Sequence, residues 1–170
     1  APVKGRRPIA GFYASGSHRI VNFEACPVQP DLSVRIAQKI KDLAERFGWP
    51  AYEEERRRGW LRHLYVRTNQ AGEAIVALVT NSPDFPNRET FVSEMCRSFP
   101  QITGLYHNVQ PLKTSVILGP TWKRMWGARG IEEKIGRFSF FISPGAFLQV
   151  NTPAAELLYD AALSALTEGN

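Results

Sequence analysis

Cysteine is scarce in this 170-residue chain, which carries only Cys26 and Cys96. Two cysteines are too few for a disulfide framework, and the three histidines lack the spacing of metal ligands. Hydrophobic runs fall well short of the ~20 residues that a membrane-spanning helix needs, so we expect no membrane contact. Residues 1–7 are followed by no apolar stretch typical of a signal peptide. Together these absences predict a cytoplasmic protein.

Several motifs that mark enzymes are also missing. The chain has no G-x-G-x-x-G loop, no Walker A motif, no G-x-S-x-G and no H-E-x-x-H. Composition and spacing alone are therefore compatible with a binding module that has no reaction of its own.

Positive charge is the clearest feature that is present. The net charge is +5, with 21 Lys and Arg against 16 Asp and Glu. A moderately basic domain suits a polyanion through phosphate contacts, although many basic proteins bind no nucleic acid. Basic and aromatic residues also interleave in one stretch, at Trp122, Lys123, Arg124, Trp126 and Arg129. This pattern suits single-stranded nucleic acid, or equally the edge of an aromatic core with solvated charges.

Turn residues and hydrophobic periodicity divide the chain into a mixed set of elements. We expect a β-hairpin over 8–22, helices at 31–47 and 87–99, strands at 60–68, 73–80, 102–109, 114–118 and 138–142, and a helix from Thr152. Asp31, Asn87 and Thr152 are the expected N-caps. Residues 74–79 are continuously apolar, which predicts a central strand. The order predicts an α+β fold with a mixed, largely antiparallel sheet and packed helices.

The stretch from Phe138 to Pro153 organises the end of the chain. After its strand and a turn at Pro144-Gly145, it presents Phe147 and Gln149 on a short extended piece. The following helix is expected to bury Leu157, Leu158, Ala161, Ala162 and Leu166. An aromatic ring and an amide at such a junction suit a flat polar ligand, such as a base or a nucleoside-like cofactor. A well-capped core helix with an exposed Gln is the alternative.

Five segments occur in an order that resembles one protein family. They are GFYASGSHRIV (11–21) followed by Cys26-Pro27, LRHLYVR (61–67), ITGLYHN (102–108), VILG (116–119) and FISPGAFLQVN (141–151). Together they resemble the central domain of RNA uracil-C5 methyltransferases. The bacterial enzymes that methylate 23S rRNA are the most similar branch, and the tRNA branch is a near neighbour.

The resemblance implies roles for individual residues. Gln149 corresponds to a Gln that contacts S-adenosylmethionine, and Phe147 to an aromatic residue beside the flipped-out target base. Cys26 corresponds to the last of four cysteines that hold a [4Fe–4S] cluster. The alternative is that Cys26 is an ordinary buried cysteine that binds no cluster. Arg62 and His63 are further candidates for RNA contact, or else belong to an ordinary strand edge. Neighbours on a strand point to opposite faces, so at most one of the two should meet a given ligand.

The family's other cluster cysteines, catalytic cysteine and general base have no counterpart in these residues. We therefore expect 1–137 to be an RNA-binding and catalytic-support domain. Residues 138–170 would lead into a Rossmann-like S-adenosylmethionine domain that this sequence does not contain. Alone, the chain should be a monomer that cannot methylate RNA. Its expected partner is 23S rRNA; a tRNA substrate and a non-catalytic RNA-binding module are the alternatives.

Overall fold

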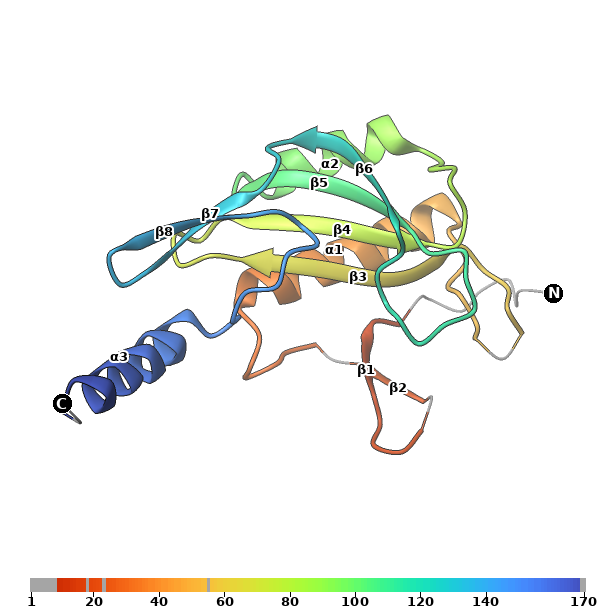
Figure 1. Ribbon diagram of the computed structural model, residues 1–170. Coiled ribbons are helices and arrows are strands. Elements are labelled where there is room, and N and C mark those ends of the chain that lie inside the picture. Colours follow the sequence, from red (N-terminus) through yellow and green to blue (C-terminus); the bar gives the residue numbers. More distant parts are fainter. Residues whose placement is uncertain (1–8, 18, 23, 55, 169–170) are drawn as a thin grey trace.

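A computed structural model describes residues 9–17, 19–22, 24–54 and 56–168 (Figure 1). Its elements follow the chain as β1 Gly11–Tyr13, β2 Ile20–Asn22, α1 Asp31–Phe47, β3 Leu61–Thr68, β4 Ala74–Thr80, α2 Arg88–Ser98, β5 Ile102–Val109, β6 Thr121–Gly127, β7 Ile131–Ile135, β8 Phe138–Ile142 and α3 Thr152–Glu168. The α+β class is confirmed. So is the first hairpin, formed by β1 and β2, although Pro8 and His18 lie outside the described residues.

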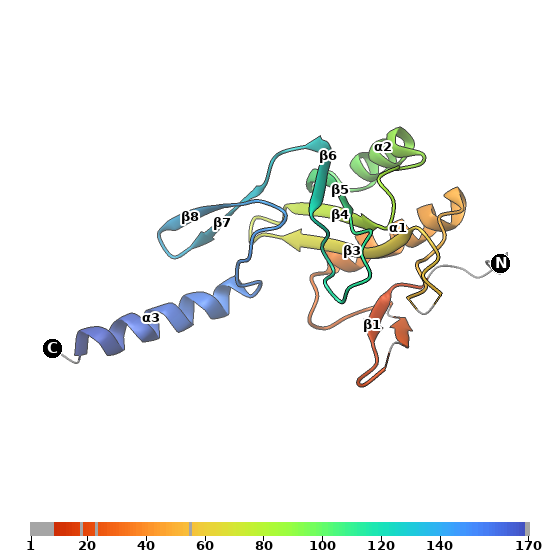
Figure 2. The same ribbon diagram turned by 45° about the vertical axis from the view of Figure 1, so that its right-hand side comes forward.

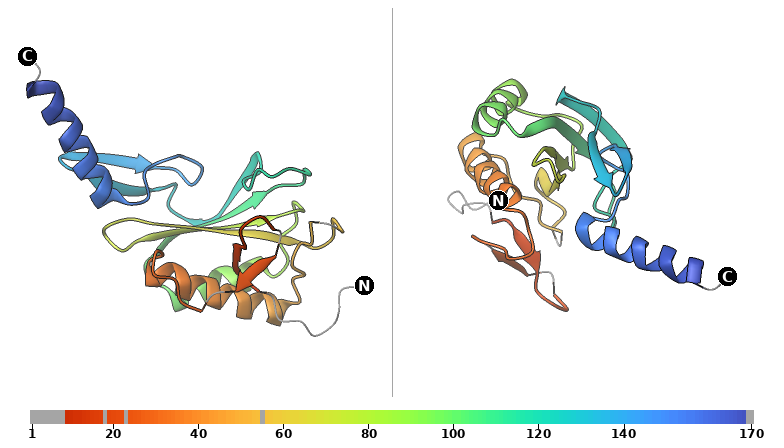
Figure 3. Two further views of the ribbon diagram at one scale, coloured as in Figure 1. Left: turned by 90° about the horizontal axis from the view of Figure 1, so that it is seen from below. Right: turned by 90° about the vertical axis from the view of Figure 1, so that its left-hand side faces the viewer.

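A four-stranded sheet in the order β3-β4-β5-β6 forms the centre of the molecule. Strands β4 and β5 are parallel and are joined through α2, while the other neighbouring pairs are antiparallel. All seven residues of β4 are buried, which confirms the predicted central strand. Helices α1 and α2 lie together against one face of the sheet (Figure 3). The main core forms there, from residues such as Ile36, Leu43, Leu78, Phe91 and Met95.

Helix α1 begins and ends for identifiable reasons. At its C-terminus Gly48 takes a left-handed conformation with φ of 66°, which glycine adopts without steric cost. The N–H groups of Gly48 and Trp49 then donate to the carbonyls of Glu45 and Ala44. At the N-terminus the prediction was wrong by one residue, because Pro30 holds the cap position. Asp31 instead lies in the first turn, where its charge suits the helix dipole.

An ion cluster joins the two helices. The carboxylate of Glu94 on α2 lies 3.0 Å from Lys39 Nζ and 3.1 Å from Arg46 Nη2, both on α1, and 3.2 Å from Arg97 Nη2. Hydrogen bonds from Lys39 and then Arg46 hold the pKa of Glu94 at about 2. Helix α2 itself follows Asn87 as predicted, but the Asn87 side chain makes no capping hydrogen bond.

The predicted strand at 114–118 is wrong, since these residues form a loop. Two buried amide side chains, one in β5 and one on the residue that follows it, hold this loop by hydrogen bonds where a strand would have ladder bonds. Gln110 Nε2 donates to the carbonyls of Val116 and Leu118, at 3.1 and 3.3 Å. Asn108 Nδ2 donates to the Gly119 carbonyl at 2.9 Å, and its Oδ1 accepts from the Gly119 N–H at 2.6 Å. The chain resumes pairing only in β6, an edge strand of the sheet.

The β7–β8 hairpin and α3 lie on the side of the sheet away from α1 and α2 (Figures 2 and 3). Ile131 of β7 packs with Ile75, Ala77 and Tyr106, which forms a second, smaller core. The hairpin leads into α3, which extends away from the sheet (Figures 2 and 3).

The predicted burial of α3 is wrong. Its side chains are largely open, with exposed fractions of 73% at Leu157, 61% at Leu158 and 72% at Leu166, and both Ala161 and Ala162 are exposed. Helical spacing of apolar residues identified the helix, but no described element packs along that face. Among the described residues, no helix combines the length and the apolar character needed to cross a bilayer.

Candidate functional site

The junction between β8 and α3 has the predicted strand–turn–helix form. The Ala146 N–H donates to the Ser143 carbonyl at 3.0 Å and closes the turn. This turn packs against β6. The position that a Cβ on Gly145 would occupy is 3.6 Å from the Trp122 indole. Beyond the turn the chain has no regular structure, and 85% of the Phe147 side chain is exposed. Gln149 is also exposed and makes no hydrogen bond with another described residue. Both side chains are therefore open to a partner.

The start of α3 is held by polar contacts that differ from the predicted cap. Asn151 Oδ1 accepts from the Ala154 N–H at 3.2 Å, so Asn151 rather than Thr152 caps the helix. The Thr152 hydroxyl is buried and instead donates to the Glu133 carboxylate at 3.2 Å. Glu156 accepts from the Gly136 N–H at 2.8 Å. The helix is thus anchored to the β7–β8 hairpin at its first turns.

Apolar side chains gather on β8, on α3 and on the segment between them. Phe138, Phe140 and Phe141 are 56%, 42% and 64% exposed, and Val150 is 91% exposed. With the α3 leucines they make up what is called here the β8–α3 apolar surface, a set of exposed apolar residues on several sides of the two elements: Phe138, Phe140, Phe141, Val150, Leu157, Leu158, Leu163 and Leu166. So many exposed apolar side chains on neighbouring elements suit a contact with another apolar surface.

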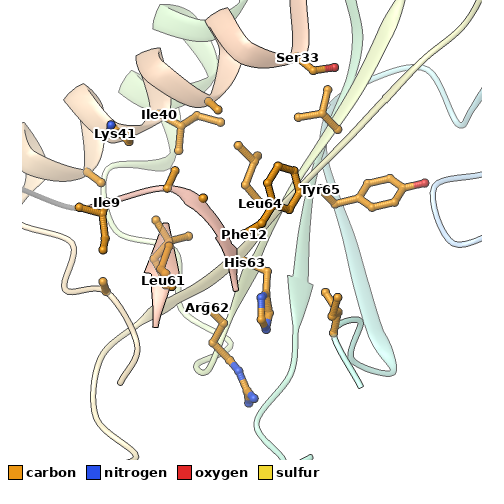
Figure 4. A pocket seen from close by; sticks show the side chains of 18 of the residues that line it. Ile9, Phe12, Ser33, Ile40, Lys41, Leu61, Arg62, His63, Leu64 and Tyr65 are labelled. Atoms are coloured by element: carbon orange, nitrogen blue, oxygen red, sulfur yellow. The ribbon is translucent and has the colours of Figure 1, made fainter. Parts of the chain in front are cut away.

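Arg62 and His63 lie where β3 enters the sheet, at a β-bulge. Leu61 pairs with Thr80 and His63 with Val79, so Arg62 is an extra residue in the ladder. The bulge breaks the strict alternation of side chains, and both residues line one cavity (Figure 4). The strict alternation on which that prediction rested is absent at this bulge, and the prediction about a ligand itself stays a prediction.

The two side chains differ in how they are held. Arg62 Nη1 donates to the carbonyls of Gln110 and Leu112, both at 2.8 Å, and the guanidinium lies 4.5 Å from the centre of the Tyr52 ring. The imidazole of His63 makes no hydrogen bond with another described residue. Burial, and then the charge of Arg62, lower the pKa of His63 below its usual value, while Glu54 opposes them. His63 is therefore neutral at pH 7.

The basic and aromatic stretch at β6 is partly packed and partly exposed. Trp122 is half-buried, with its ring edge-on to Tyr106 at a centroid distance of 6.2 Å. Trp126 is 41% exposed, and Arg124 is exposed. Lys123 turns toward the helices and donates to the Pro83 carbonyl at 2.9 Å. Sequence reasoning missed Tyr106 as a neighbour of Trp122, because only the β5–β6 register brings the two together.

Cys26 is a half-buried free cysteine. In the part of the chain that the structure describes, no three His, Cys, Asp or Glu residues lie together as a metal site would require. A [4Fe–4S] cluster takes four ligands, usually thiolates, and this chain has two cysteines. The residues present therefore do not fit a complete cluster.

Comparisons with known proteins give related sequences and a related fold. No family model matches the chain. An uncharacterized RNA methyltransferase of Halalkalibacterium halodurans is 36% identical over 156 residues, which are 91% of this chain and 34% of that protein. One of Bacillus cereus is 36% identical over 164 residues, or 95% of this chain and 36% of that protein. One of Synechocystis is 38% identical over 151 residues, or 88% of this chain and 32% of that protein.

A solved structure shares the fold. It is the tRNA (uracil-54, C5)-methyltransferase of Pyrococcus abyssi in complex with S-adenosyl-L-homocysteine, with a TM-score of 0.72 and 24% identity. The match covers 85% of this chain and 35% of that one. The chain thus spans about a third of the proteins to which it is similar.

Proposed function

Because most of the chain is similar in sequence to segments of RNA methyltransferases, we propose that it is part of an S-adenosylmethionine-dependent enzyme that forms 5-methyluridine in 23S rRNA. The observation that carries this proposal is sequence similarity to RNA methyltransferases over 91–95% of the chain. The uracil-C5 reaction and the rRNA substrate come from the motif resemblance, and tRNA is the second candidate substrate. Such an enzyme would act in the cytoplasm.

Within that enzyme, residues 1–137 would bind RNA and 138–170 would lead to the domain that holds the cofactor. Phe147 would pack beside the target base, and Gln149 would contact S-adenosylmethionine, which supplies the methyl group. The open position of both side chains fits these roles. Methylation at C5 needs a thiolate that adds to C6, and neither Cys26 nor Cys96 matches that nucleophile. We therefore expect no methyl transfer by this chain alone.

The β8–α3 apolar surface would be covered by the rest of the enzyme. The compared relatives are about three times as long as the matched segment, so they contain enough further chain to do so. This surface directly flanks Phe147 and Gln149 in sequence. Its burial would therefore bring these two residues to the boundary between segments, where a cofactor and a base can both be reached.

RNA binding by the 170-residue chain tests this function. Fluorescence anisotropy with labelled rRNA and tRNA stem-loops over a salt series should show affinity that falls steeply with salt. The variant Phe147→Ala should bind more weakly, by about fivefold or more, because stacking on one base is worth roughly 1–3 kcal/mol. The matched control Val28→Ala removes another apolar side chain, which is 81% exposed, and should bind like the wild type.

The alternatives have distinct outcomes. Absence of binding at low salt would overturn the RNA role of this segment. A preference for the tRNA stem-loop would select the second substrate. Transfer of a labelled methyl group to either RNA by the purified chain would refute the expectation that catalysis needs residues outside it.

A further inference from the structure

We propose that the cavity between the β1–β2 hairpin, α1 and β3 binds one unstacked nucleotide of the RNA, separate from the base that is methylated. The identity of the ligand rests on the proposed function. The site itself rests on the shape, lining and charge of the cavity.

The cavity is large enough for a small ligand and mostly apolar. It has a volume of about 440 Å³, which lies in the range of ligand pockets of roughly 300–1,000 Å³. Three elements supply its walls, among them Phe12 from β1, Ile40 from α1 and Leu64 from β3 (Figure 4). Apolar walls of this kind can accept a base that has left its stack.

Large apolar side chains are open around this cavity. Ile9 and Ile117 are each 53% exposed, and Phe12 is 54% exposed. Aromatic side chains are a common platform for unstacked bases, because every base has a π-face. Phe12 therefore gives the cavity a stacking surface as well as apolar volume.

Arg62 and His63 add a polar edge. Both lie at the bulge and line the cavity, and the two backbone carbonyls that accept from Arg62 fix its guanidinium in advance. The Nε of Arg62 is buried and has no hydrogen-bond partner among the described residues. His63 also lacks such a partner. A neutral imidazole offers one donor and one acceptor, which suits the edge of a base.

The charges that line the cavity favour an anionic ligand such as a nucleotide over a cationic ligand. The lining includes two cations, Lys41 and Arg62, besides the neutral His63, and its described residues contain no Asp or Glu. Lys41 is nearly buried and donates to Asn22 Oδ1 at 3.0 Å, so it is positioned rather than mobile. A base in the apolar part would bring its phosphate toward these cations.

Histidine NMR on the full 170-residue chain tests the site directly. The Cε1–H resonance of His63 is assigned by its absence in His63→Phe, a variant that keeps the ring and the neutral charge. Single-stranded hexauridylate and hexaadenylate should shift this resonance saturably. The resonance of His107, which is 2% exposed and lies on the helix-covered side, should stay in place.

Anisotropy with the same labelled oligonucleotides measures the effect on affinity. His63→Phe should weaken binding about five- to tenfold, as expected for the loss of one or two hydrogen bonds. Phe12→Ala should weaken binding to a similar extent. The matched control Phe138→Ala removes a ring that is equally exposed, at 56%, but lies outside the cavity, and should bind as the wild type does.

The outcomes separate this proposal from the proposed function. If RNA binds while His63 stays unshifted and His63→Phe binds normally, the nucleotide site is overturned and the RNA role stands. If inorganic phosphate alone shifts His63 as far as RNA does, the cavity is an anion site and the base is excluded. If the wild-type chain binds no RNA, both proposals fail.

Discussion

His107 should make the folded state sensitive to mild acid. Its imidazole is 2% exposed, and its Nε2 lies 2.6 Å from Thr80 Oγ1. Phe85 lies edge-on at a centroid distance of 5.0 Å. The Thr80 hydroxyl gives its single proton to the Ser82 carbonyl at 2.8 Å, so the short contact is made by an Nε2–H of the neutral ring. Burial, followed by the charge of Lys123, lowers the pKa of His107 to about 4.

The magnitude follows from linkage. In the unfolded chain the same imidazole has a pKa of 6.5, so between pH 6.5 and 4 the unfolded state binds a proton that the folded state does not. The stability from this residue is fully present above pH 6.5 and is lost as the pH falls. With about 1.4 kcal/mol per pKa unit, the loss is about 2 kcal/mol at pH 5 and about 3 kcal/mol in total.

Urea unfolding followed by tryptophan fluorescence at pH 7.5, 6, 5 and 4.5 measures this loss. His107→Gln keeps a polar group near Thr80 but does not titrate. It should be less stable than the wild type at pH 7.5 and should lose less stability on acidification. His63 also has a lowered pKa, so the comparison is repeated in a His63→Phe background. Equal losses for wild type and His107→Gln between pH 7.5 and 5 would refute the reasoning.

Two further predictions concern charge and exposure. Glu94→Gln should lower the urea midpoint at pH 7, because the three cations around Glu94 lose their carboxylate. The depressed pKa of Glu94 gives stability above pH 4.5 that is lost toward pH 2. The difference in stability between the wild type and Glu94→Gln should therefore close over that range in acid titrations followed by circular dichroism. A difference that persists at pH 2 would contradict this reasoning. Leu158→Lys should change the stability of the chain by no more than about 0.5 kcal/mol, since Leu158 is 61% exposed, whereas Leu105→Ala in the core should cost about 2–5 kcal/mol. Urea unfolding of both variants checks this, and equal costs would show that α3 is packed.

Some of the fold was predictable because local signals and packing agree. Helix α1 spans the predicted residues 31–47, since its apolar stripe ends at a glycine that stops helices. Strand β4 was predictable because continuous apolar residues fit a strand with neighbours on both sides.

Other parts depend on contacts that no local pattern encodes. The segment 114–118 has strand-forming residues, but the Gln110 side chain donates to the carbonyls of Val116 and Leu118, and Asn108 holds the adjoining Gly119. Strand β7 was missed because Glu133 takes an inward position between Ile131 and Ile135, which hides the alternation. That burial is possible because Glu133 accepts from the Gln70 N–H at 3.2 Å and from Thr152.

The candidate site was predictable at the junction and less so at β3. The turn at Pro144-Gly145 and the helix after Asn151 set the exposed position of Phe147 and Gln149, and both features are visible in the sequence. The bulge at Arg62 is not, because it arises from the register between β3 and β4. The roles of Gln149, Phe147, Arg62, His63 and Cys26 stay predictions.

The order of the core elements along the chain has a consequence for synthesis on the ribosome. The helices and strands of the four-stranded sheet lie between residues 31 and 127, and Ile131 joins soon afterwards. A nascent chain emerges N-terminus first, and its domains tend to fold as units. The sheet and its two helices can thus close while α3 is still inside the exit tunnel. When α3 emerges, its exposed leucines meet a sheet that has already folded, so any partner that covers them docks onto a preformed core.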